Sequence, residues 1–98
     1  MIEIKLFDKV GSFAEDKDAA GVLREEVILP ALAKGDKLQI DFAGITLATQ
    51  SFIHALIAEA LRQNGVEALD RIEFKSCDKV VKGIVQTVVQ YVLETSET

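Results

Sequence analysis

The sequence predicts a small α/β domain with a mostly parallel sheet and alternating helices. Residues 2–6, 38–42 and 71–75 alternate apolar and polar side chains with period two, which is typical of half-buried strands. Longer segments with apolar residues at helical spacing lie between and after them. Strands that alternate with helices favour parallel pairing through crossover connections, so these observations together define the fold class.

Length and composition indicate one domain over residues 1–98. The net charge of −5 and the scattered basic residues argue against nucleic acid and anionic membrane surfaces. The single cysteine, Cys77, excludes an internal disulfide, and no apolar run approaches the roughly 20 residues of a membrane span. The first residues do not resemble a signal peptide. We therefore expect a cytoplasmic domain, with residues 93–98 as a frayed polar tail.

In the first half of the chain, residues 2–6 are predicted as a strand near the sheet edge. Residues 8–18 are polar and predict a loop, with a short extra strand around Phe13. Asp18 is a suitable N-cap for a helix from Ala19, in which Pro30 predicts a kink or an early end and Gly35 a stop. The predicted buried face of this helix comprises Val22, Leu23, Val27 and Ala31.

In the second half, the strand at 38–42 leads through a turn at Gly44 into a helix over 50–63. The buried face of this helix is predicted at Phe52, Ile53, Leu56, Ile57, Ala60 and Leu61. After the strand at 71–75, Asp78 is predicted to cap the last helix. Its apolar positions, spaced by about four, are Val80, Val81, Ile84, Val85, Val88, Val89, Val92 and Leu93.

Functional groups of parallel sheets gather at the carboxyl ends of the strands, which here are residues 41–51 and 76–78. Thr49 and Ser51 begin the central helix, where a hydroxyl often serves only as a helix cap. The same position exposes a hydroxyl whose phosphate would meet free N–H groups and the positive end of the helix dipole. Both interpretations remain open at this point.

The outer face of the central helix is a candidate docking surface for another protein. Ser51, Ala55, Ala58 and Arg62 follow each other at helical spacing, and small alanines allow close approach. Alanine is also simply a good helix former. The complete set of candidate binding residues is Asp41, Thr49, Gln50, Ser51, His54, Ala55, Ala58 and Arg62.

An enzyme is not expected. Ser51 and His54 share a helical face, but the sequence indicates neither an orienting acid nor an oxyanion hole for them. Asp41 can cap its own loop, orient Ser51 or bind a metal, and Cys77 is either a reactive thiol or an inert buried one. No phosphate-binding glycine loop, HExxH motif or paired CxxC is present, so no cofactor or metal is predicted.

The segment from Leu38 to Phe52 resembles the signature of STAS domains, the fold of anti-anti-sigma factors. Its strand ends in Asp41-Phe42 and leads through a short turn to the Ser51-Phe52 pair. Residues 24–30 resemble the first helix of an uncharacterised STAS-like group. The resemblance covers roughly residues 20–93. It implies a STAS-like fold over the whole chain.

In anti-anti-sigma factors the matching serine is phosphorylated by a histidine-kinase-like ATPase, which is also the anti-sigma factor. The resemblance implies that Ser51 is a candidate phosphoacceptor and that the helix start is a docking surface. The sigma-factor family usually has Asp-Ser-Ser-Gly where this chain has residues 49–52, Thr-Gln-Ser-Phe. The chain therefore lacks the acid of that motif and has a phenylalanine in place of the glycine.

Two functions follow from these observations. The first is a non-catalytic protein-interaction module with Ser51 as a switch, acting as a monomer or a homodimer. The second is a small-molecule or nucleotide-binding domain, which would be favoured by a pocket bounded by Asp41, Thr49 and Cys77.

Overall fold

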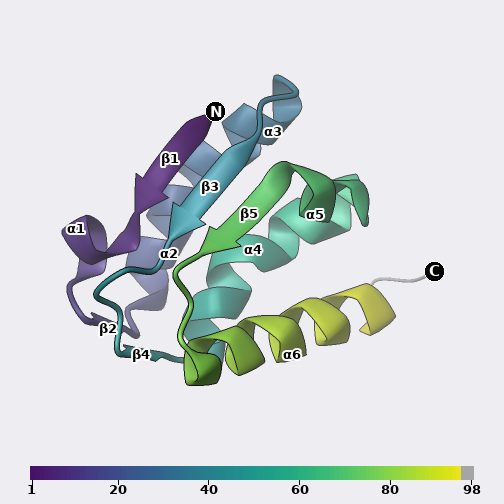
Figure 1. Ribbon diagram of the computed structural model, residues 1–98. Helices are drawn as coiled ribbons and strands as arrows, with labels where there is room; N and C mark the ends of the chain where they lie inside the picture. The colour runs from purple at the N-terminus through teal and green to yellow at the C-terminus, as the bar shows by residue number, and fades with distance from the viewer. Residues whose placement is uncertain (96–98) are drawn as a thin grey trace.

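A computed structural model describes residues 1–95 of the protein and shows an α/β domain (Figure 1). Its elements, in chain order, are β1 (Ile2–Lys5), α1 (Leu6–Val10), β2 (Phe13–Ala14), α2 (Lys17–Leu23), the π-helical turn η1 (Arg24–Ile28), α3 (Leu29–Ala33), β3 (Leu38–Asp41), β4 (Leu47–Ala48), α4 (Gln50–Asn64), α5 (Glu67–Arg71), β5 (Ile72–Lys75) and α6 (Lys79–Thr95).

The three predicted strands form one parallel sheet with the order β1-β3-β5, which confirms the predicted pairing. Ile2, Leu38 and Ile72 lie side by side in register, so the three strands are matched along their length. β1 is an edge strand, as its alternating pattern predicted. β2 and β4 form a separate, parallel two-stranded sheet, and β2 corresponds to the short extra strand predicted around Phe13.

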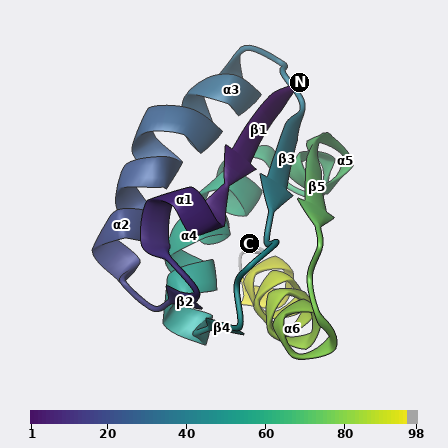
Figure 2. The ribbon, with the colours of Figure 1, turned by 60° about the vertical axis from the view of Figure 1, so that its left-hand side comes forward.

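Only one face of the main sheet is buried. Ile4, Leu38, Ile40 and Ile72 lie in the core, whereas the alternate positions of all three strands are exposed or half-buried. The helices α2, α3 and α4 gather on the buried face, and none of the helices in the described part of the chain covers the other (Figures 1 and 2). Parallel sheets usually carry helices on both faces, so the open polar face is an unusual feature.

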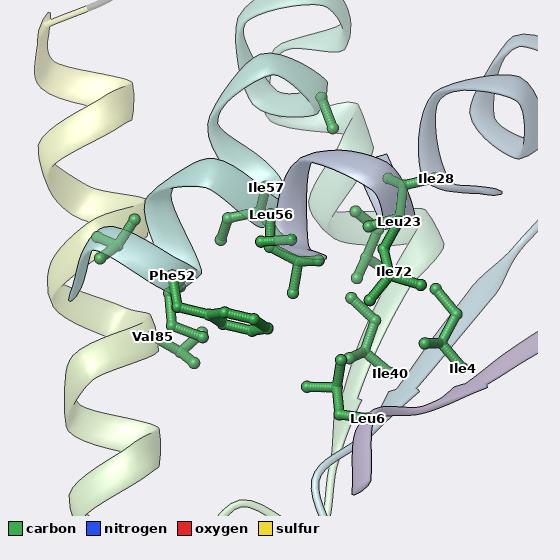
Figure 3. Close-up of a cluster of buried hydrophobic side chains, with 14 of the residues drawn as sticks. Ile4, Leu6, Leu23, Ile28, Ile40, Phe52, Leu56, Ile57, Ile72 and Val85 are labelled. Atoms are coloured by element: carbon green, nitrogen blue, oxygen red, sulfur yellow. The ribbon is translucent and has the colours of Figure 1, made fainter. Parts of the chain in front are cut away.

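The core lies between this sheet face and α4 (Figure 3). Ile4, Ile40 and Ile72 of the strands belong to the same buried cluster as Leu56 and Phe52 of α4. α4 in turn packs between α2 on one side and α6 on the other. All six residues predicted for its buried face are buried in the structure. The period-3.6 pattern therefore identified the central helix correctly.

The first helical region differs from its prediction. It begins at Lys17 rather than Ala19, because the N-cap is Asp16, whose carboxylate accepts hydrogen bonds from the N–H groups of Asp18 and Ala19. The predicted cap Asp18 is thus inside the helix. The chain stays helical through Ala33, so the helical region does not end early at Pro30 but stops just before Gly35, as predicted.

The π-helical turn η1 explains the changed helical face. In a regular α-helix, the five residues from Leu23 to Ile28 would rotate the side chain by about 140°. The wider i→i+5 bonding of η1, seen where the Leu29 N–H donates to the Arg24 carbonyl, keeps Ile28 near the side of Leu23. Leu23 and Ile28 are both buried, whereas Val22, predicted to be buried, is 51% exposed.

The ends of α4 and α6 follow the sequence signals. α4 ends before Gly65, which has a φ of 67°. At the start of α6, the carboxylate of Asp78 accepts a hydrogen bond from the Val81 N–H at 2.8 Å, as predicted. Val81 is buried but Val80 is 62% exposed, since adjacent positions of a helix point in different directions. Residues 93–95 of the predicted tail continue α6, and residues 96–98 lie outside the described part.

Two short helices were not predicted. α1 follows β1 directly, begins at Leu6, the last residue of the predicted strand, and ends within the segment predicted as a loop. It buries Leu6. α5 follows α4 after a two-residue turn and buries Ala68. Each is a single turn of five residues, too short to show a helical period in the sequence.

Candidate functional site

The hydroxyl groups at the start of α4 have different roles. Thr49 is the N-cap, and its Oγ1 accepts a hydrogen bond from the Phe52 N–H at 3.1 Å. Ser51 is the second residue of the helix and is exposed. No residue in the described part of the chain hydrogen-bonds the Ser51 hydroxyl, and the capping role is already taken by Thr49. The side chain of Ser51 is therefore free to react or to bind.

Ser51 lines a groove of about 480 Å³ between the first turns of α4 and the middle of α6. His54 and Ala55 contribute from α4, and Val88 and Tyr91 from α6. The rings of His54 and Tyr91 lie beside each other in a tilted arrangement, with centroids 6.4 Å apart and an interplanar angle of 55°. Three other predicted binding residues, Gln50, His54 and Ala55, thus share this groove with Ser51.

Four groove residues could not have been found from the sequence as part of this site. Lys17 lies at the start of α2, and Thr87, Val88 and Tyr91 lie on α6, all at least 30 positions away from Ser51 along the chain. Only the packing of α4 against α2 and α6 brings them to Ser51. The exposure of Tyr91, at 56%, was the only feature of these residues that marks a contact surface.

The prediction of an exposed docking face along α4 is wrong at Ala58, in the middle of the helix. Ala58 is only 3% exposed, since α2 and α6 cover both flanks of the helix. Ala55 is half-buried, and its carbonyl accepts a hydrogen bond from Nη1 of Arg24 at 2.9 Å. Arg62 is exposed, but 11 residues separate it from Ser51, which is about 16 Å along the helix. Arg62 therefore belongs to a different surface from the groove.

Asp41 is placed on the open face of the sheet, in register between Lys5 and Lys75. Its Oδ1 accepts from the Ala43 N–H at 2.9 Å, which is the local loop-capping role considered for it. Asp41 and Thr49 line neither the α4–α6 groove nor the smaller groove that contains Cys77. The three residues proposed to bound a small-molecule pocket therefore do not share one groove.

The pair Ser51 and His54 shares the groove, but no hydrogen bond joins the two side chains in the described part of the chain. No carboxylate among residues 1–95 hydrogen-bonds His54 either. The same residues contain no group of three His, Cys, Asp or Glu side chains that could hold a metal ion. No helix within this range is long and apolar enough to cross a membrane.

Cys77 is a free, half-buried thiol at the end of β5. Burial raises the pKa of this thiol, neighbouring Asp78 raises it further, and Lys82 lowers it to a smaller extent. A raised pKa leaves less thiolate at neutral pH, and the thiolate is the reactive form. This environment is that of an unreactive cysteine.

We expect Cys77 to alkylate more slowly than free cysteine at pH 7, with a pH–rate midpoint above that of free cysteine. The rate of iodoacetamide labelling, followed by mass spectrometry between pH 6 and roughly pH 11, measures this midpoint. Lys82→Ala removes the lowering charge and should raise the midpoint further, whereas Lys9→Ala, far along the chain, should leave it unchanged. A midpoint below that of free cysteine would contradict the assignment.

The fold and the groove define a small parallel α/β domain with an accessible hydroxyl beside the start of its central helix. A family model described as a STAS-like domain of unknown function (DUF4325) matches residues 19–82. The chain belongs to this family, which confirms the resemblance seen in the sequence. Comparisons with curated proteins and with solved structures found no match.

Proposed function

We propose that this STAS-like domain is a non-catalytic protein-interaction module whose docking surface is the α4–α6 groove, with phosphorylation of Ser51 as the switch. The observation that carries the proposal is the exposed Ser51 hydroxyl, which Thr49 releases from capping and which opens into a groove. The proposed partner is a histidine-kinase-like ATPase, by analogy with anti-anti-sigma factors.

The groove suits a protein side chain in the unphosphorylated state. Val88 forms a buried apolar base, and Tyr91 provides an exposed aromatic wall. An aromatic wall beside an apolar base is a frequent feature of protein docking sites, since it gives a large contact area at low entropic cost. In this state the described residues that line the groove include no acidic side chain, and Lys17 is the one lysine or arginine among them, beside the polar Gln50, Ser51, His54 and Thr87.

Phosphorylation would change the charge of this groove. A phosphate on Ser51 adds about −1.5 to −2 charges at pH 7. It would be stabilised by the N-terminal end of α4 and by Lys17 across the groove, so the fold tolerates it. An apolar partner group would then have to enter beside a hydrated dianion, which disfavours binding. The modified and unmodified forms should therefore differ in partner affinity rather than in fold.

The phosphorylation step is tested with candidate partner kinases and ATP, followed by mass spectrometry of the modified peptide. We expect modification at Ser51, complete loss of that modification in Ser51→Ala, and no modification of exposed Thr87 in the same groove. Modification confined to other residues would rule out the switch.

The binding step is tested by retention of the same partner on immobilised variants. We expect Ser51→Ala to bind as the wild type and Ser51→Asp to bind at least about tenfold more weakly, a difference of about 1.4 kcal/mol. Gln86→Glu adds the same single charge to α6 outside this groove and is the matched control, with no expected loss. Equal retention of Ser51→Asp and wild type would contradict the docking surface.

A further inference from the structure

The outer side of β5 is an unpaired strand edge. β5 ends the sheet order, and no strand in the described part of the chain pairs its outer side (Figure 1). The Phe42 N–H donates to the Lys75 carbonyl at 2.8 Å, so the backbone groups of Lys75 point inward, toward β3. Because these groups alternate in direction along a strand, Phe74 presents its N–H and carbonyl to the outer side. This edge can accept another strand.

Apolar surface lies directly beside this edge. A groove of about 540 Å³ between β5 and α6 is lined mainly by Leu69, Phe74, Val85, Val89 and Leu93. All but Val85 are only partly buried, and Leu69, Phe74 and Val89 pack against the core. An unpaired strand edge flanked by an apolar groove is the arrangement used in binding by strand addition.

The opposite edge provides an internal comparison. β1 has the sequence Ile-Glu-Ile-Lys and β5 has Ile-Glu-Phe-Lys, so both edges carry the same charge pattern. Ile4, which corresponds to Phe74, is only 4% exposed. The groove beside β1 is smaller, about 340 Å³, and four of its seven lining residues are charged, namely Glu3, Lys5, Asp8 and Lys9, beside Ile4, Leu23 and Val27. Charged side chains therefore predominate beside β1, whereas apolar side chains predominate beside β5.

We propose that the occupant of the β5 edge is a second copy of this chain, paired antiparallel about a two-fold axis at Phe74. In this register the two Phe74 residues exchange both backbone hydrogen bonds. Glu73 lies opposite Lys75 of the second copy, and this ion pair occurs twice because the interface is symmetric. The two three-stranded sheets then form one continuous sheet, and the two apolar grooves adjoin.

The neighbouring register is excluded by charge and by hydrogen bonding. A two-fold axis at Glu73 would place the two Glu73 carboxylates opposite each other, which is destabilising. It would also require the Ile72 N–H as a donor, but this group already donates to the Ala68 carbonyl. The sequence of β5 is therefore self-complementary in one antiparallel register, the one centred on Phe74.

Sedimentation velocity over a concentration series tests the dimer and its register. We expect the wild-type dimer to have a dissociation constant below about 1 mM. Glu73→Lys or Lys75→Glu alone should raise the dissociation constant at least about tenfold, because each turns two attractions into two repulsions. An equimolar mixture of these two variants should recover a dimer, since each then supplies the charge that the other lacks. Recovery in the mixture also shows that both variants are folded.

The matched controls are Glu3→Lys and Lys5→Glu, which make the same charge changes on β1. Both should dimerise as the wild type does. A monomeric wild type up to that concentration would overturn the proposal, as would dissociation caused by the β1 variants. Failure of the mixed β5 variants to associate, with each variant folded by circular dichroism, would overturn the register. The docking groove on α4 is unaffected by any of these outcomes.

Discussion

Replacing Phe52 with alanine should lower the free energy of unfolding by about 3–5 kcal/mol. Phe52 is completely buried, and its ring lies between α4 and the sheet (Figure 3). The substitution removes apolar contacts and leaves a cavity that the surrounding helices and strands cannot fill. Domains of this size have a total stability of about 5–15 kcal/mol, so the variant is expected to be marginally folded.

Urea unfolding followed by circular dichroism measures this loss. Phe13→Ala is the matched control, because it makes the same change at a residue that is 56% exposed, and its effect should stay within about 0.5 kcal/mol. Similar losses for both variants would show that Phe52 is not a core residue. The result also bears on the family motif, since a buried Phe52 cannot belong to the docking surface that its neighbour Ser51 contributes to.

Replacing Gly44 with alanine should cost about 2–4 kcal/mol, the second-largest effect we predict. Gly44 has a φ of 87°, a conformation that strains any residue with a Cβ. A Cβ built on Gly44 would also lie 2.7 Å from Cδ2 of Phe7, closer than van der Waals contact allows. Backbone strain and steric overlap therefore add at this one position.

Two further variants separate these contributions. Gly35→Ala has a similar φ of 82° with no atom within 4 Å of the added Cβ, so it should show only the strain, about 1–2 kcal/mol. In the Phe7→Ala background, Gly44→Ala should cost less stability than in the wild type, because the steric overlap is absent. A double-mutant cycle measures this difference. If the cycle shows no coupling between residues 7 and 44, the contact is not significant for stability.

The predictable part of the fold is the part in which local pattern and tertiary packing agree. The strands at 38–42 and 71–75 and the helix after Thr49 were correctly placed, because each repeats its apolar residues over several periods. The register of α2 and α3 was not predictable, since η1 changes the helical period within the segment and brings Ile28 near the side of Leu23. The amino-acid composition of the segment does not indicate such a π-helical turn.

The position of the candidate site at Ser51 was predictable, but the set of residues that surround Ser51 was not. Ser51 was identified because a hydroxyl at a helix start follows from sequence alone. The burial of Ala58 depends on which helices flank α4, and the groove depends on residues from α6 that are distant in the chain. Asp41 was grouped with Ser51 because both follow the carboxyl end of a predicted strand, but Asp41 lies on the open sheet face. The direction of the Asp41 side chain therefore separates it from the site around Ser51, and this direction was not considered in the sequence-based prediction.

The difference between the two sheet edges limits how far copies of this chain can associate. Both edge strands carry the same charge pattern, so a molecule with two equally receptive edges would add copies at each end and grow into an open filament. Ile4 is buried and charged side chains predominate in the groove beside β1, so this edge is less receptive than the β5 edge. Pairing through β5, as proposed, would therefore stop at two copies, and a substitution that exposes Ile4 would carry the risk of fibre formation.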